Sequence, residues 1–132
     1  MAYVFTQAAN PQAIAELQWG EGADIMFTAF TSCIGLMGIN GNNVIGVHLA
    51  LRDANDQAVD NADIDAAIAL LNNATQPVII GATAIWEQAA PTEYHHLLTQ
   101  LQPVEIYAYG DGTYGGEIVN HAGVMAIQPR YA

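Results

Sequence analysis

The residues best placed to do chemistry in this sequence are its one cysteine, Cys33, and the histidine fifteen residues later, His48. Between them stands Asn40-Gly41, the strongest short signal for a two-residue type I′ turn, in which both central residues need positive φ. That turn predicts a β-hairpin with Cys33 directly opposite His48 on one face of the sheet. The Cβ atoms of such a pair lie roughly 4.5–5.5 Å apart.

The register of this hairpin decides whether the two side chains meet. A two-residue loop shifted onto Gly41-Asn42, or a four-residue loop around it, keeps Cys33 and His48 on one face as diagonal neighbours. A three-residue loop changes the parity and separates them unless a bulge compensates. In the first register Gly35 faces Gly46 beside the pair, which predicts a substrate cleft at these two glycines, where bare backbone can be approached.

A thiol beside an imidazole is the basic unit of cysteine catalysis. The base makes a thiolate at neutral pH, which is the minimum requirement for a cysteine hydrolase or transferase. The alternative interpretation is that Cys33 is a small buried hydrophobic residue and His48 a packing residue. Among the other histidines, His121 lies in an expected strand and is an alternative base. His95 and His96 point about 100° apart on an expected helix, so they do not form a facing metal pair.

Other kinds of site find little support in the sequence. Ser32 lacks a Gly-x-Ser-x-Gly elbow, so we expect it to orient or solvate the site rather than to act as the nucleophile. The glycine-rich stretch 110–116 is not followed by a helical pattern, which favours a loop over a phosphate-binding turn. No cluster of Cys, His and Asp shows metal-ligand spacing, so neither a metal nor another cofactor is expected.

The composition excludes several classes of partner. The 132-residue chain has 13 acidic residues against two arginines and no lysine, for a formal net charge of −11. With so few cations, binding to nucleic acid or to an anionic membrane is not expected, and a basic protein surface is the more natural partner. No apolar run approaches the ~20 residues of a membrane span, and no secretory signal is visible. We therefore expect one domain, 1–132, that acts in the cytoplasm or is delivered into a target cell.

The hydrophobic pattern predicts helices that alternate with strands. Helices are expected over 11–19, 60–73 and 91–101. Strands are expected over 3–5, 24–30, 77–83, 104–109 and 117–127, besides the hairpin over 33–51. Helices between strands, together with an antiparallel hairpin, favour an α+β fold: a mixed, largely antiparallel β-sandwich flanked by helices.

Two short segments suggest a family. Residues 30–36, Phe-Thr-Ser-Cys-Ile-Gly-Leu, followed by residues 46–51, Gly-Val-His-Leu-Ala-Leu, resemble the Cys/His core of the CheD-like and cytotoxic necrotizing factor-like glutamine deamidases. The resemblance implies the mixed α/β sandwich of those catalytic domains and hydrolysis of a glutamine side-chain amide on a protein substrate. By position, Cys33 resembles the nucleophile and His48 the general base.

The group that orients the histidine differs among these proteins. CheD-like proteins place a threonine six residues before the cysteine, where this sequence has Phe27. Thr28 and Thr31 are the threonines near that position, and Ser32 adjoins the cysteine. These three are the candidate third members. Necrotizing-factor-type proteins instead orient the histidine through a backbone carbonyl.

Together these features predict a cysteine-dependent protein glutamine deamidase of the kind found among bacterial toxins and effectors. Acyl transfer to an amine, as in a transglutaminase, uses the same pair and stays open. So do two other functions: a non-catalytic acidic protein-interaction module in which Cys33 belongs to the core, and a cysteine amidase or peptidase acting on small substrates.

Overall fold

The central hairpin owes its register to Gly41. In the computed structural model, which describes residues 4–132, β4 (Ile34–Asn40) pairs with β5 (Asn43–Leu49) so that Asn40 faces Asn43 and Gly41-Asn42 forms the loop. Gly41 has a φ of +64° at the first loop position, where a type II′ turn takes glycine. The expected type I′ turn on Asn40-Gly41 is therefore wrong, and the hairpin adopts the alternative two-residue loop.

Two sheets and three helices make up the α+β fold. The larger sheet has the strand order β1-β2-β5-β4-β6-β7 and the smaller one the order β3-β8-β9. The other strands are β1 (Thr6–Gln7), β2 (Gln18–Gly22), β3 (Asp24–Met26), β6 (Thr75–Gly81), β7 (Glu105–Ala108), β8 (Tyr114–His121) and β9 (Val124–Tyr131). The helices are α1 (Asn61–Leu70), α2 (Thr83–Ala89) and α3 (Pro91–Leu101).

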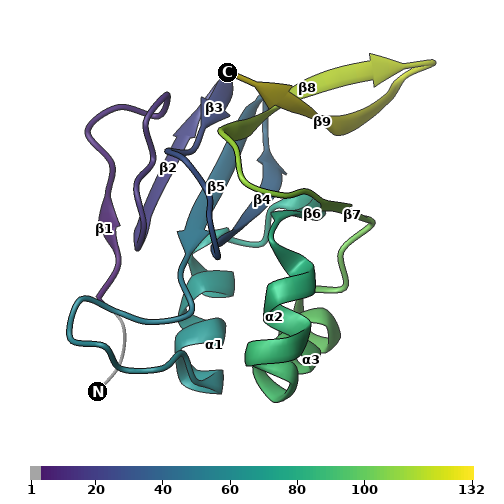
Figure 1. Cartoon of the computed structure of the whole chain (residues 1–132). Helices are drawn as coiled ribbons and strands as arrows, with labels where there is room; N and C mark the ends of the chain where they lie inside the picture. Colours follow the sequence, from purple (N-terminus) through teal and green to yellow (C-terminus); the bar gives the residue numbers. More distant parts are fainter. Residues whose placement is uncertain (1–3) are drawn as a thin grey trace.

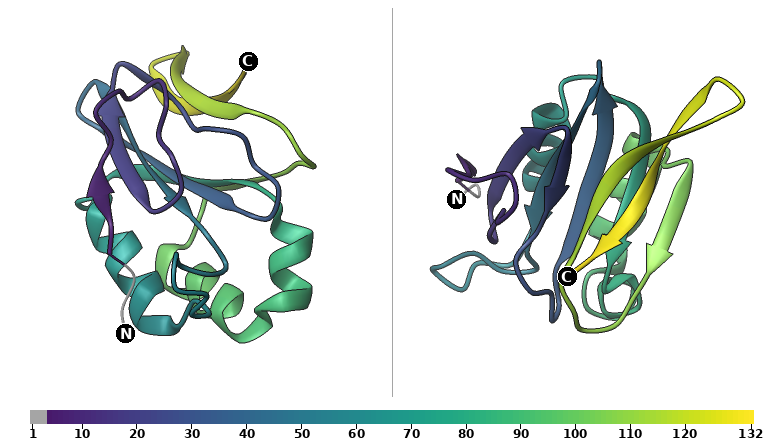
Figure 2. Two further views of the ribbon diagram at one scale, coloured as in Figure 1. Left: turned by 60° about the vertical axis from the view of Figure 1, so that its left-hand side comes forward. Right: turned by 90° about the horizontal axis from the view of Figure 1, so that it is seen from above.

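The larger sheet lies between the helices and the smaller sheet (Figures 1 and 2). One face of β4, β5 and β6 packs against the helices through a core that includes Leu36, Val47, Ile79, Ile64, Trp86 and Leu97. The other face packs against the smaller sheet and the segments around it through Met37, Val44, Ile80, Ile25, Phe27 and Ile127. Because both faces are covered, the central strands read as nearly continuous apolar runs in the sequence.

The helices predicted over 60–73 and 91–101 are confirmed. α3 spans Pro91–Leu101 as predicted, with proline in its first turn, and α1 lies within the predicted range 60–73. α2 was not predicted; its Trp86 is fully buried and donates its indole N–H to the Ser32 carbonyl at 2.9 Å. Over residues 4–132, none of the helices combines the length and apolarity needed to span a membrane.

The predictions for the first thirty residues are largely wrong. The predicted helix over 11–19 is wrong: residues 18–19 belong to β2, and the backbone of 11–17 bonds with other segments instead. Met26 donates to the Pro11 carbonyl, and Ile14 and Phe27 form a bridge. Of the expected strand 3–5, Tyr3 lies outside the described residues and 4–5 carry no strand. The expected strand 24–30 already ends at Met26.

The last strands form a hairpin rather than one strand over 117–127. β8 and β9 pair along their whole length, and Ala122-Gly123 reverses the chain with φ values of 55° and 84°. Positive φ at both positions is typical of a type I′ turn. Ala-Gly is a weaker turn signal than Asn-Gly, which is why the pattern read as a single strand.

The N-terminus of α1 provides a test of this local structure. Asp60 accepts from the Asp63 N–H at 2.8 Å, and the Asp63 carboxylate accepts from the Asp60 N–H at 3.0 Å, which is a capping box. Asp60→Ala is expected to lower the free energy of unfolding by about 1 kcal/mol, whereas Asp60→Asn, which still caps, is expected to lower it far less. Urea unfolding at neutral pH measures both, and equal losses in the two variants would contradict the cap assignment.

Candidate functional site

Cys33 and His48 lie on the same face of the hairpin but are not directly opposite. His48 faces Gly35, and Cys33 stands two residues before Gly35, so the two are diagonal neighbours. Diagonal Cβ atoms lie roughly 7–8 Å apart, within reach of long side chains. The expected direct pairing is wrong, while the shared face is as expected. Both side chains are closed off from solvent, with exposed fractions of 1% for Cys33 and 0% for His48.

One ring nitrogen of His48 is fixed by the backbone. His48 Nδ1 lies 2.9 Å from the Ile14 carbonyl oxygen, which also accepts the Thr28 N–H at 2.9 Å. A carbonyl oxygen can only accept, so Nδ1 carries the hydrogen and Nε2 bears a lone pair. Burial is the largest effect on the imidazole and lowers its pKa, so the ring is neutral at pH 7.

The other ring nitrogen is buried without a partner. Among residues 4–132, His48 Nε2 has no hydrogen-bond partner. Phe30 meets the imidazole edge-on with ring centroids 4.6 Å apart, and Phe27 does so at 5.5 Å. A buried polar atom without a partner is rare and calls for an explanation, of which a role in chemistry is one. Aromatic packing thus holds the imidazole ring while the lone pair of Nε2 accepts no hydrogen bond.

The thiol is bound by a carboxylate. Cys33 Sγ donates to Glu16 Oε1 at 3.2 Å, and Glu16 is itself exposed at the surface. Burial raises the pKa of the Cys33 thiol, and the hydrogen bond and negative charge of Glu16 raise it further. Cys33 is therefore a neutral thiol in this closed state rather than the thiolate expected of an activated nucleophile.

The expected cleft at Gly35 and Gly46 is filled. A Cβ added at Gly35 would lie 2.6 Å from the Phe27 ring, and one at Gly46 would collide with the end of the Ile25 side chain. Gly46 faces Met37 rather than Gly35. The two glycines let the layer that carries Ile25 and Phe27 pack closely on the hairpin, so their absent side chains serve packing here.

The three candidate third members do not orient His48 with their side chains. Thr28 bonds to the same carbonyl as His48 through its backbone N–H, Thr31 is exposed, and the Ser32 carbonyl accepts from Trp86. In the part of the chain that the structure describes, none of the three has a side-chain hydrogen bond to the imidazole. The group that orients the imidazole is the main-chain carbonyl of Ile14.

The remaining histidines lie elsewhere. His121 is exposed at the tip of the β8–β9 hairpin, next to the Asn40 end of β4, whereas Cys33 precedes the other end of that strand. Seven strand residues separate the two ends, roughly 23 Å, so His121 is not the alternative base for Cys33. His96 Nε2 lies 2.8 Å from Asp65 Oδ1 and links α3 to α1. No three Cys, His, Asp or Glu side chains among the described residues are grouped to hold a metal.

Sequence reasoning missed Ile14 and Glu16. Both lie in residues 11–17, which the sequence pattern assigned to a helix, and neither is near Cys33 or His48 along the chain. Leu17, with a φ of 61°, ends this segment and leads into β2, whose pairing with β5 brings the segment beside His48. No local signal could have revealed this contact, since it depends on long-range pairing.

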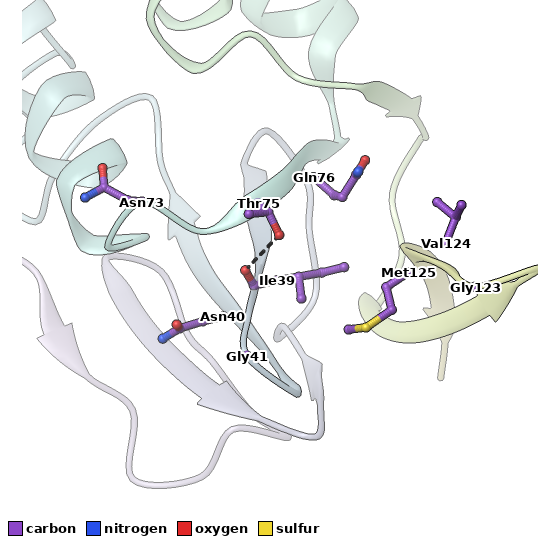
Figure 3. Close-up of a pocket in the computed structure, with 9 residues that line it drawn as sticks. All are labelled: Ile39, Asn40, Gly41, Asn73, Thr75, Gln76, Gly123, Val124 and Met125. Carbon is purple, nitrogen blue, oxygen red and sulfur yellow. Dashed lines mark hydrogen bonds between the residues drawn. The ribbon is translucent and has the colours of Figure 1, made fainter.

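A surface pocket lies at the turn end of the hairpin, around Gly41. It measures about 670 Å³ between the β4–β5 turn, the start of β6 and the β8–β9 turn (Figure 3). Asn73 and Gln76 line it with φ values of 58° and 52°, and the Thr75 hydroxyl bonds the Ile39 carbonyl at 3.4 Å. The lining consists of amide, hydroxyl, glycine and apolar groups, without a titratable side chain. It offers a neutral surface and no nucleophile.

Comparisons with protein-family models, with curated proteins and with solved structures found no match to this chain. The candidate site consists of a thiol and an oriented imidazole on one face of the hairpin, both closed off from solvent, with the thiol donating to the Glu16 carboxylate.

The buried imidazole predicts how stability depends on pH. The unfolded chain takes up a proton at His48 near pH 6.5, and the folded protein does so only at lower pH. The contribution of neutral His48 to the free energy of unfolding is therefore expected to be complete above about pH 6.5 and to be lost as the pH falls below it. Urea unfolding between pH 8 and 5 measures this slope.

Two variants separate His48 from the other groups that titrate in this range. His48→Gln is expected to flatten the slope between pH 7 and 5, whereas His121→Gln, at an exposed position, is expected to retain it. A His48→Gln protein with the wild-type slope would show that another group controls the acid sensitivity.

Proposed function

We propose that this protein is a cysteine-dependent hydrolase of the protein-glutamine deamidase type, with Cys33 as nucleophile and His48 as general base. One observation carries the proposal: the lone pair of His48 Nε2 is buried without a partner on the hairpin face that holds the thiol. A buried basic nitrogen with its tautomer fixed by a carbonyl is what a general base requires. The resemblance of residues 30–36 and 46–51 to the deamidase core supports the same assignment.

The proposed reaction has two stages. His48 Nε2 takes the Cys33 proton, and the thiolate attacks the carbon of a glutamine carboxamide. The tetrahedral intermediate collapses as His48 returns the proton to the leaving nitrogen, which releases ammonia and leaves a thioester. Water, deprotonated by His48, then hydrolyses the thioester to give glutamate and the free thiol. The Ile14 carbonyl stabilises the imidazolium that forms in each stage.

The charge of the chain bears on the substrate. A net charge of −11 favours a substrate protein with a basic surface and disfavours nucleic acid. The two packed sheets, with helices on the outer face of the larger one, are compatible with the sandwich of CheD-like and necrotizing-factor-type domains. We include that fold in the proposal. A free catalytic thiol is kept active in a reducing compartment such as the cytoplasm.

A specific observation favours the second candidate, a non-catalytic acidic interaction module. Cys33 is 1% exposed and its pKa is raised, as expected of a cysteine that serves only in the core. Under this interpretation the excess of acidic residues provides the function by binding a basic partner. The two candidates differ in whether the thiol is ever used.

Mass spectrometry of protein substrates tests the proposal. Wild-type protein, incubated with a cell lysate or a panel of basic proteins, is expected to convert particular glutamines to glutamate without cutting the chain. Cys33→Ser is expected to abolish the conversion, and His48→Gln to reduce it by about 10²–10⁴-fold, the usual contribution of a general base.

The matched control is His121→Gln, which changes a histidine outside the site and is expected to retain wild-type activity. Conversion that persists at the wild-type rate in folded Cys33→Ser protein would rule out the proposed nucleophile. Cleaved chains would instead point to a peptidase, and cross-linked amines to acyl transfer.

A further inference from the structure

Two groups that can accept a proton, Glu16 and His48, belong to the site of Cys33. Glu16 Oε1 accepts the thiol hydrogen of Cys33 in this structure, with the donor sulfur 3.2 Å away. His48 Nε2, on the same face of the hairpin, has no partner among residues 4–132. The negative charge of Glu16 acts on both groups, since it raises the pKa of the thiol and of the imidazole. The carboxylate therefore opposes the thiolate while favouring a protonated imidazole.

Glu16 differs from its two neighbours in exposure. Cys33 and His48 are closed off, whereas Glu16 is exposed and belongs to an irregular segment rather than to a strand or helix. Releasing the thiol and turning into water costs such a carboxylate little, because water replaces the single hydrogen bond that it accepts from the sulfur.

We propose that Glu16 is a latch on the candidate site: its carboxylate holds Cys33 as a neutral thiol, and it has to leave before the proton can pass to His48. This inference rests on the proposed function for its biological meaning, but its physical content concerns the thiol alone. The segment 11–17 thereby supplies both the Ile14 carbonyl that orients the base and the Glu16 carboxylate that restrains the nucleophile.

The groups that could compete with Glu16 for control of the thiol are few. Among residues 4–132, Glu16 is the charged group that acts on the Cys33 thiol, and His48 of β5 lies on the same face of the hairpin. Tyr114 of β8 stacks on Phe30, with ring centroids 5.6 Å apart, and donates its hydroxyl hydrogen to the Gly110 and Asp111 carbonyls. Its hydroxyl is thus engaged away from the sulfur.

Alkylation of the single thiol by iodoacetamide, measured across pH 6–10 on the folded protein, tests the latch. Glu16→Gln keeps the size of the side chain and removes the charge, so we expect the pKa of the thiol to fall by about one unit, which is about tenfold faster alkylation at each pH in this range. Glu16→Ala also removes the side chain that bonds the thiol, so we expect alkylation at least as fast.

The matched control is Glu21→Gln. Glu21 is another glutamate with hydrogen bonds, accepting from Asn40 and Asn43 at 3.3 and 3.1 Å near the far end of the hairpin. Its replacement is expected to leave the alkylation profile unchanged. Profiles of Glu16→Gln and Glu16→Ala that coincide with that of Glu21→Gln would overturn the latch.

A double variant identifies the group that receives the proton. If His48 takes it once Glu16 is neutral, adding His48→Gln to Glu16→Gln is expected to return the alkylation rate toward the wild-type rate. A rate that stays as high as in Glu16→Gln would overturn transfer to His48. A shifted profile without any deamidation would refute the proposed function and leave the latch standing, whereas deamidation with an unshifted profile would do the reverse.

Discussion

The register of the β4–β5 hairpin is the constraint on which the rest of the site depends. Gly41 at the first loop position places Gly35 opposite His48, and Cys33 then falls on the same face two residues away. A slip by one residue would turn His48 toward the helices and leave Cys33 on the opposite face. Gly41, at one end of the hairpin, therefore determines that Cys33 and His48 lie on the same face at the other end.

The neighbouring layers hold that register in place. Gly35 and Gly46 allow Ile25 and Phe27 to approach the backbone of the hairpin, and Phe27 and Phe30 then enclose the imidazole. The same packing that closes the supposed cleft removes water from His48 and keeps it neutral. Burial thus acts on the two groups in different ways, since it preserves the basic nitrogen but suppresses ionisation of the thiol.

Sequence patterns predicted the elements that depend on local signals. Pro91 at a helix start, the apolar spacing of the helix over 60–73 and the apolar runs on both sides of a glycine turn in the hairpin all specify their structure within a few residues. They also placed Cys33 and His48 on one face. What they missed depends on distant pairing: the irregular segment 11–17 has helical composition, but its backbone groups bond to β3 and its neighbours instead. Ile14 and Glu16 entered the site through that override of propensity.

The backbone bonds of residues 11–17 have a dynamic consequence. This segment is held by main-chain bonds, by the Gln12 side chain and by the packing of Ile14 and Leu17 rather than by a regular element, and irregular segments are where proteins open locally most easily. When it detaches, the imidazole loses its carbonyl and the sulfur its carboxylate in a single event. The protonation states of Cys33, just before β4, and of His48, on β5, are thereby tied to the detachment of a segment that belongs to neither strand.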